Sequence, residues 1–183
     1  IAYIVLKWYY VRKVDNLLKK ENMKNIKKIM LIYPPTTRPK EFTSDVVRVS
    51  AFFPLGVGYL SAVLEKTKEY EVFPLDALAA GEIDEGTEMP NGKDMRYGLT
   101  DSEIEDKIRE FDPDVIGVSC IFAALEKDMA NVCRIAKEVD SEITTIVGGH
   151  HAGSMPKGIL ELYDEIDLVV KKFYNIKRNF GKI

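Results

Sequence analysis

The chain has 183 residues, of which 46% are hydrophobic and 30% charged, and its formal net charge is −3. This composition is typical of a soluble folded domain, and two cysteines, Cys120 and Cys133, are too few for a disulfide framework or an iron–sulfur cluster. The apolar run at the N-terminus is interrupted by Lys7 and is much shorter than the ~20 residues that a membrane helix needs. We therefore expect a cytoplasmic protein without a membrane span.

The charges are distributed unevenly along the chain. Residues 1–28 carry eight Lys or Arg against two acidic residues, and residues 171–183 carry five against none. The stretch between them has 13 basic and 27 acidic residues, a net charge of −14. An acidic body repels the phosphates of nucleic acids, so we do not expect DNA or RNA as a partner.

Three segments are expected along the chain. Residues 1–22 form an N-terminal extension, residues 23–170 a folded domain, and residues 171–183 a basic C-terminal tail. Apolar side chains in the extension, Tyr10 among them, recur at roughly helical spacing but carry no chemistry.

The folded domain begins with a strand, a loop and a helix. Residues 28–33 form an apolar run that stops at Pro34 and Pro35, which predicts a buried first strand. A polar loop is expected from residue 36 to about 52. Pro54 then begins a helix, since proline is tolerated in a first turn, where its missing N–H has no helical partner anyway.

The remainder of the chain alternates between strands and helices. Residues 80–99 are rich in Gly, Glu and Asp and are predicted to form a surface excursion. Thr100 and Glu103 have the spacing of a capping box at the start of a helix. Further strands are predicted at residues 70–75, 115–119, 143–147 and 166–170. Further helices are predicted at residues 100–110, 123–139 and 156–162.

This alternation predicts a parallel α/β fold. The strands are short continuous Val- and Ile-rich runs, as in a parallel sheet that is covered on both faces. Right-handed crossovers then favour a five-stranded, doubly wound, Rossmann-like sheet of order 2-1-3-4-5 within three α/β/α layers.

Three loops at the carboxyl ends of the strands are candidates for a ligand site. They follow the first, third and fourth strands and begin at Pro34, Ser119 and Gly148. Adjacent glycines let a ligand approach the backbone closely, but taken singly each motif is also explained by an ordinary tight turn. Neither Gly-x-Gly-x-x-Gly nor a phosphate-binding Gly-Lys-Ser/Thr loop is present. His150 and His151 are adjacent and point in different directions, so they do not readily chelate one metal ion.

The order of the motifs along the chain is more specific than any one of them. Residues 29–35, 53–64, 111–119, 147–152 and 166–170 occur in sequence. This ordered set resembles the N-terminal cobalamin-binding domain of the cobalamin-dependent radical SAM enzymes, over about residues 26–170. That family includes methyltransferases and the anaerobic magnesium-protoporphyrin ester cyclase type of enzyme.

The resemblance implies cobalamin as the cofactor and assigns residues to it. The residues expected to border the corrin ring are Pro34, Pro35, Thr36, Pro54, Leu55 and Gly56. The residues expected to line the slot for the nucleotide tail, or to leave room for that tail, are Ser119, Phe122, Gly148, Gly149 and His150. Since the glycine pair leaves space, we expect a Gly149→Leu variant to lose cobalamin while the fold survives.

Two absent motifs bear on what the resemblance implies. The Asp-x-His-x-x-Gly motif of mutase-type carriers is absent, so no histidine is expected on cobalt and no residue of the chain is assigned as a metal ligand. The Cys-x-x-x-Cys-x-x-Cys motif is also absent. S-adenosylmethionine and a 4Fe-4S cluster would then belong to a radical SAM domain or subunit, and we expect no catalysis by this chain alone.

Other functions on the same fold stay open. A non-catalytic interaction or vestigial domain that binds no cofactor is the main alternative, and it is favoured if His150 or Met155 fills the slot. A receiver-like module is weakly supported, because Pro34 and Ser119 stand where receivers carry acids. A flavin site is compatible with the fold, but the ordered motifs favour cobalamin.

Overall fold

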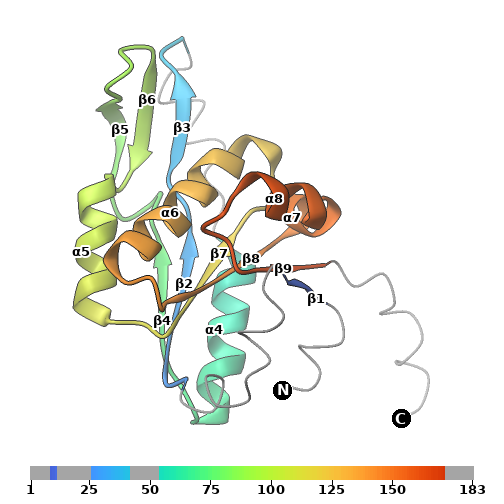
Figure 1. The fold of residues 1–183 in the computed structure, drawn as a ribbon. Helices are drawn as coiled ribbons and strands as arrows, with labels where there is room; N and C mark the ends of the chain where they lie inside the picture. The colour runs from blue at the N-terminus through green and yellow to red at the C-terminus, as the bar shows by residue number, and fades with distance from the viewer. Residues whose placement is uncertain (1–8, 12–25, 42–53, 172–183) are drawn as a thin grey trace.

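The computed structural model describes residues 9–11, 26–41 and 54–171, and they contain one large sheet with helices on both faces (Figure 1). The sheet has six strands in the order β1-β9-β8-β7-β2-β4, of which all but β1 are parallel. The strands are β1 (Tyr9–Val11), β2 (Lys28–Tyr33), β4 (Glu71–Asp76), β7 (Val115–Ser119), β8 (Thr144–Gly148) and β9 (Leu168–Val170).

The parallel part of this sheet confirms the predicted fold class. Taken in chain order, the five parallel strands have the arrangement 2-1-3-4-5. The helices are α4 (Leu55–Thr67), α5 (Asp101–Phe111), α6 (Glu126–Val139), α7 (His150–Ser154) and α8 (Pro156–Leu162), with a short 3₁₀ helix η2 (Ala123–Leu125) before α6. The capping box of α5 is present, since Glu103 N–H donates to Thr100 Oγ1 and Thr100 N–H donates to Glu103 Oε2. No helix of the described residues is long and apolar enough to cross a membrane.

The N-terminal extension contributes one strand. Tyr9–Val11 pairs antiparallel with β9, so the helical spacing of this segment does not correspond to a helix there. Pairing with β1 satisfies an edge of β9 that would otherwise present unpaired backbone groups. The remaining residues of the extension, most of the predicted loop over 36–52 and the tail from residue 172 lie outside the described residues.

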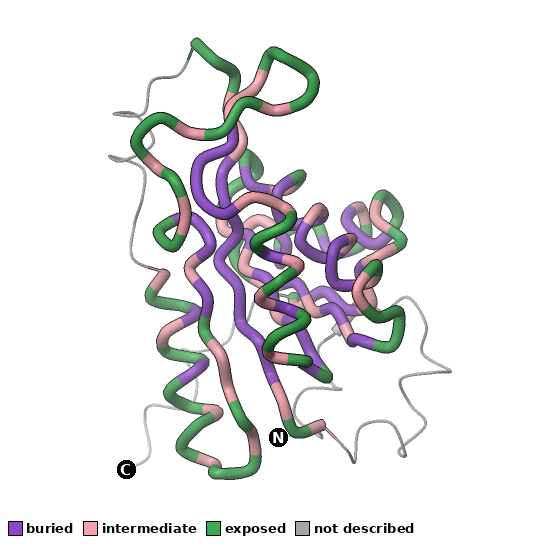
Figure 2. Tube along the Cα trace, turned by 90° about the vertical axis from the view of Figure 1, so that its left-hand side faces the viewer, coloured by how far each residue is buried: buried purple, intermediate pink, exposed green. Residues whose placement is uncertain are grey.

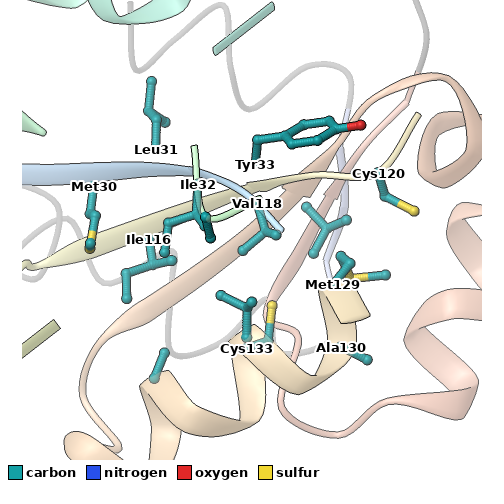
Figure 3. Close-up of a cluster of buried hydrophobic side chains, with 14 of the residues drawn as sticks. Met30, Leu31, Ile32, Tyr33, Ile116, Val118, Cys120, Met129, Ala130 and Cys133 are labelled. Atoms are coloured by element: carbon teal, nitrogen blue, oxygen red, sulfur yellow. The ribbon is translucent and has the colours of Figure 1, made fainter. Parts of the chain in front are cut away.

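One face of the sheet forms the centre of the core. Met30 and Ile32 of β2, and Ile116 and Val118 of β7, point toward α6, as Figure 3 shows. All four are almost completely buried. Leu31 and Tyr33 point to the opposite face, where α4 packs against β2 and β4. Figure 2 shows the buried strands in purple between helical turns whose outer residues are exposed.

A second, antiparallel sheet contains most of the predicted surface excursion. It has the order β3-β6-β5 and extends beyond the carboxyl end of β2 (Figure 1). Its strands are β3 (Thr36–Pro39), β5 (Glu82–Glu88) and β6 (Asp94–Gly98). The surface excursion predicted over residues 80–99 thus contains two strands that the sequence did not predict. Most side chains of β5 are polar and exposed, so the alternation that signals a half-buried strand is missing from its sequence.

A buried polar network joins the small sheet to the helices. The Arg96 guanidinium, in β6, donates to Thr37 Oγ1 and to Asp101 Oδ1, each at 2.9 Å. Asp128, in α6, accepts from the backbone N–H of Thr37 at 2.9 Å and lies 3.7 Å from Arg96. The side chains of Arg96 and Asp128 are only 5% and 4% exposed. Burial raises the pKa of Asp128, and the hydrogen bonds from Thr37 and the nearby guanidinium groups of Arg96 and Arg38 oppose that rise.

We expect an Arg96→Met variant to lose about 3–5 kcal/mol of stability, because it leaves the Asp128 carboxylate buried without its cation. Urea unfolding measures the loss. The matched control is Arg109→Met, which breaks an exposed pair with Glu105 on α5 and should cost about 0.5 kcal/mol or less. Equal stability of the two variants would contradict the role given to the network.

Candidate functional site

Two of the three predicted loops meet at the carboxyl edge of the sheet. Ser119 at the end of β7 is paired with Gly148 at the end of β8. The backbone N–H of Cys120 donates to the Gly148 carbonyl at 2.6 Å, which carries the pairing beyond the strands. The loop that begins at Pro34 follows β2, the neighbour of β7 on its other side. The structure thus places the three loop origins on three adjacent strands.

A row of small residues lies on the face of the sheet opposite α6. Residues paired across parallel strands share a face, so Gly117 and Ser119 of β7 lie on the same face as Ile146 and Gly148 of β8. All four are half-buried, whereas Val118 and Val147 on the other face are almost completely buried. We call Gly117, Ser119 and Gly148 the small-residue strip. The described residues cover this part of the sheet incompletely, although the Leu31 side chain already lies 2.7 Å from where a Cβ of Gly117 would be.

The two glycines after β8 have different roles. A Cβ added to Gly148 would come no closer than 3.8 Å to the described atoms, those of Val170, which is an ordinary contact. Gly149 has a φ of +108°, and a Cβ there would lie 2.5 Å from the Cys120 carbonyl oxygen. The expectation that the fold tolerates leucine at 149 is therefore wrong, because backbone atoms occupy that space. Gly148, rather than Gly149, leaves room for a ligand.

The residues predicted to border a corrin ring are of two kinds. Pro34, Pro35 and Thr36 are buried, and Thr36 is paired with Tyr97 in the small sheet. In contrast, Leu55 is 74% exposed in the first turn of α4, and a Cβ on Gly56 would meet nothing within 4 Å. Pro54 is half-buried at the start of that helix. Phe122, in the loop after β7, is 54% exposed.

The two histidines differ in their surroundings. His150 is exposed at the first residue of α7. His151 is largely buried, and its Nε2 lies 2.5 Å from Glu126 Oε2 at the first residue of α6. The Tyr163 hydroxyl donates to the other oxygen of Glu126 at 2.9 Å. We call Glu126, His151 and Tyr163 the clasp. Sequence reasoning missed it, because its partners are 25 and 37 residues apart and follow no motif.

The clasp changes the acidity of its members. The hydrogen bond from His151 lowers the pKa of Glu126, and the bond from Tyr163 adds to the effect. Burial, and then the neighbouring Glu126, raises the pKa of Tyr163 to about 12. Tyr163 therefore stays protonated at neutral pH and can donate to the carboxylate.

Neither cysteine supplies a thiolate nucleophile, and the described residues form no metal centre. Burial raises the pKa of the Cys120 thiol to about 12, so it stays protonated, and it raises the pKa of Cys133 as well. Within the described ranges no three His, Cys, Asp or Glu side chains converge to hold a metal ion. The geometry instead suits non-covalent binding at the half-buried face of the sheet.

The comparisons with known proteins name a family for this type of site. The family described as "B12 binding domain" matches residues 46–172. The match covers well over half of this chain, and the chain has a parallel α/β sheet of the order 2-1-3-4-5. Its class is therefore a cobalamin-binding type of domain. The chain belongs to the B12-binding domain family, which confirms the resemblance stated from the motifs.

Individual relatives are similar to most or part of the chain. A cytidylyl-2-hydroxyethylphosphonate methyltransferase of Streptomyces wedmorensis is 36% identical over 142 residues, 78% of this chain and 26% of the relative. An uncharacterized methyltransferase of Pyrococcus horikoshii is 29% identical over 80% of this chain and 27% of its own length. An anaerobic magnesium-protoporphyrin IX monomethyl ester cyclase of Rubrivivax gelatinosus is 32% identical over 42% of this chain and 14% of its own. The chain spans about a quarter of the first two relatives.

We expect acid to weaken the clasp in a defined direction. The folded protein binds a proton on Glu126 less readily than the unfolded chain, because its pKa is below the ordinary value of 4.5. The stabilisation is therefore fully present above that value and is lost as the pH falls through the lowered pKa. A Glu126→Gln variant should be less stable at neutral pH and show a shallower loss of stability in acid. Urea unfolding between about pH 7 and pH 3 measures both, and parallel curves for variant and wild type would contradict the assignment.

Proposed function

We propose that this chain binds cobalamin across the small-residue strip and the first turn of α4, as the carrier module of a radical SAM methyltransferase- or cyclase-type system. Family membership supports the cofactor, and the names of the relatives support the type of reaction. The observation that carries the proposal is the unequal cover of the sheet. The strip is half-buried while the face against α6 is sealed.

The strip fits the nucleotide tail of cobalamin. Gly148 has no side chain, and a group there would meet only the ordinary contact with Val170 among the described residues, whereas the Leu31 side chain already lies 2.7 Å from where a Cβ of Gly117 would be. A planar base can therefore lie against the backbone of β8 at Gly148. The Ser119 hydroxyl on the same face can donate to or accept from a polar group of the tail. Gly149 contributes through the turn that it permits, and the exposed His150 borders that turn.

The corrin ring is assigned to the exposed first turn of α4. Leu55 offers apolar surface of the kind that covers a flat macrocycle, and the exposed Phe122 is assigned to the slot for the tail. Pro54 and Gly56 frame Leu55 at the start of α4. The buried residues Pro34, Pro35 and Thr36 would act by shaping the end of β2 rather than through large contact areas.

Bound cobalamin would supply a cobalt centre able to carry a methyl group. We propose that no histidine of this chain ligates that cobalt. Nε2 of His151 is engaged by Glu126, and His150 follows β8 rather than the first strand of the domain. The residues of the chain would therefore hold and orient the cofactor through its periphery. S-adenosylmethionine and its 4Fe-4S cluster are proposed to be bound by a radical SAM domain or subunit, since this chain has two cysteines, both buried.

An interaction module that binds no cofactor is the second candidate. It is favoured by the apolar surface of α4, where Leu55, Tyr59, Leu60 and Val63 are all exposed. The two functions differ in whether the isolated chain retains cobalamin, so one titration distinguishes them. A cytoplasmic location remains a prediction from the sequence.

The titration uses hydroxocobalamin, with desalting and a visible spectrum of the retained complex. We expect wild-type protein to bind and a Gly148→Leu variant to bind about a hundredfold more weakly, a change of about 2.7 kcal/mol, because leucine would occupy the strip. The matched control is Gly158→Leu, where a Cβ on α8 has the same 3.8 Å clearance. Equal retention by both variants would remove the site, and no retention by wild type would favour the interaction module.

A separate experiment tests whether a histidine of this chain ligates the cobalt. The bound cofactor is reduced to Co(II) and its spin-resonance spectrum is recorded with natural and isotopically labelled protein nitrogen. We expect identical spectra, because no protein nitrogen lies on the cobalt. Superhyperfine splitting that changes with the label would contradict this part of the proposal.

A further inference from the structure

We infer that the clasp, formed by Glu126, His151 and Tyr163, positions the Gly148–Gly149 turn to receive the nucleotide tail. The inference rests on the proposed function and adds three positioning residues to it. None of them is expected to touch the corrin ring, and neither Glu126 nor Tyr163 belongs to the motifs that suggested cobalamin.

The clasp connects the two loops that carry the tail site. Glu126 is the first residue of α6 and directly follows the loop from Ser119 to η2. His151 is the second residue of α7 and lies two positions after Gly149. The 2.5 Å contact between their side chains therefore fixes the start of α7 relative to the start of α6.

Both oxygens of the Glu126 carboxylate are occupied. His151 holds one oxygen and Tyr163, just after α8, donates to the other. A carboxylate held at both oxygens has its plane fixed, so it can set a position more sharply than a single contact. The His151 and Glu126 side chains are 13% and 23% exposed, so water screens them less than an exposed pair such as Glu105 and Arg109.

Backbone contacts show what the clasp supports. The Cys120 carbonyl accepts from the backbone N–H groups of His151 at 3.1 Å and Ala152 at 3.3 Å. It is the same carbonyl that excludes a side chain at Gly149. The Cys120 carbonyl thus contacts the glycine turn and the start of α7, and it connects both to the loop after β7. Since α7 has only five residues, its own helical bonds fix its position weakly, and the clasp supplies the missing side-chain support.

We expect loss of the clasp to affect only the binding of the nucleotide tail. Without the clasp, the start of α7 can shift and a smaller fraction of the protein has the turn in its binding form, which weakens apparent affinity by that fraction. The residues assigned to the corrin ring on α4 are attached to β2 and β4 instead. Loss of the clasp should therefore weaken binding of a ligand with a tail and leave a ligand without one almost unchanged.

The test compares cobalamin with cobinamide, which has the corrin ring but lacks the nucleotide base. Their dissociation constants are measured by visible titration, and by competition when the cobinamide complex is weak. We expect His151→Ala and Glu126→Gln to bind cobalamin about tenfold more weakly, the order expected for losing one charge-assisted hydrogen bond. Cobinamide binding should change by less than about twofold, within the error of such a comparison.

Control variants distinguish a positioning role of the clasp from a general loss of folding. Glu105→Gln makes the same chemical change in the exposed pair on α5 and should bind both ligands like wild type. Tyr163→Phe removes one hydroxyl and should give a smaller loss in the same direction, so it serves if His151→Ala does not fold. A His151→Gln variant keeps a nitrogen donor and should recover part of the affinity for cobalamin.

The outcomes are distinct. A selective loss of cobalamin affinity supports the inference. Unchanged affinity, or equal loss of cobalamin and cobinamide in folded variants, overturns it while leaving cobalamin binding in place. Failure of wild-type protein to bind either ligand overturns the proposed function itself, and the clasp inference with it.

Discussion

The structure depends on the unequal cover of a parallel sheet. In the order 2-1-3-4-5, right-handed crossovers send the helix after the first strand to one face and the later helices to the other. The face against α6 is sealed by large apolar side chains such as Ile32 and Ile116. On the opposite face α4 packs over β2 and β4, and the small residues of β7 and β8 stay half-buried. We propose that the ligand site lies where the described residues leave one face of the sheet incompletely covered.

Much of this architecture could be predicted from the sequence, for physical reasons. Continuous Val- and Ile-rich runs locate the strands, because strands buried on both faces need apolar residues at every position. Thr100 and Glu103 locate the start of α5 through hydrogen bonds that are local. The polar hairpin of β5 and β6 was missed, since neither of its faces is consistently apolar and its attachment depends on the distant Asp128. Gly148 and Gly149 look alike in sequence, and only their backbone surroundings distinguish them.

The candidate site combines residues that the sequence predicted with residues that only the structure reveals. The glycine pair and Ser119 were predicted from their place after β7 and β8, whereas Glu126 and Tyr163 contribute through contacts that no spacing reveals. Taken with membership in the B12-binding domain family, these features describe a module that holds a cofactor. The chemistry would then depend on groups outside the chain, in keeping with a span of about a quarter of the methyltransferase relatives.

The central claim is that the tail of cobalamin lies on the sheet face opposite α6. A crystal structure of the chain with bound hydroxocobalamin tests it most directly. The account predicts the nucleotide base in van der Waals contact with Gly148, away from the cobalt. A base that remains on the cobalt, or a cofactor bound on the α5 and α6 side of the sheet, would contradict it.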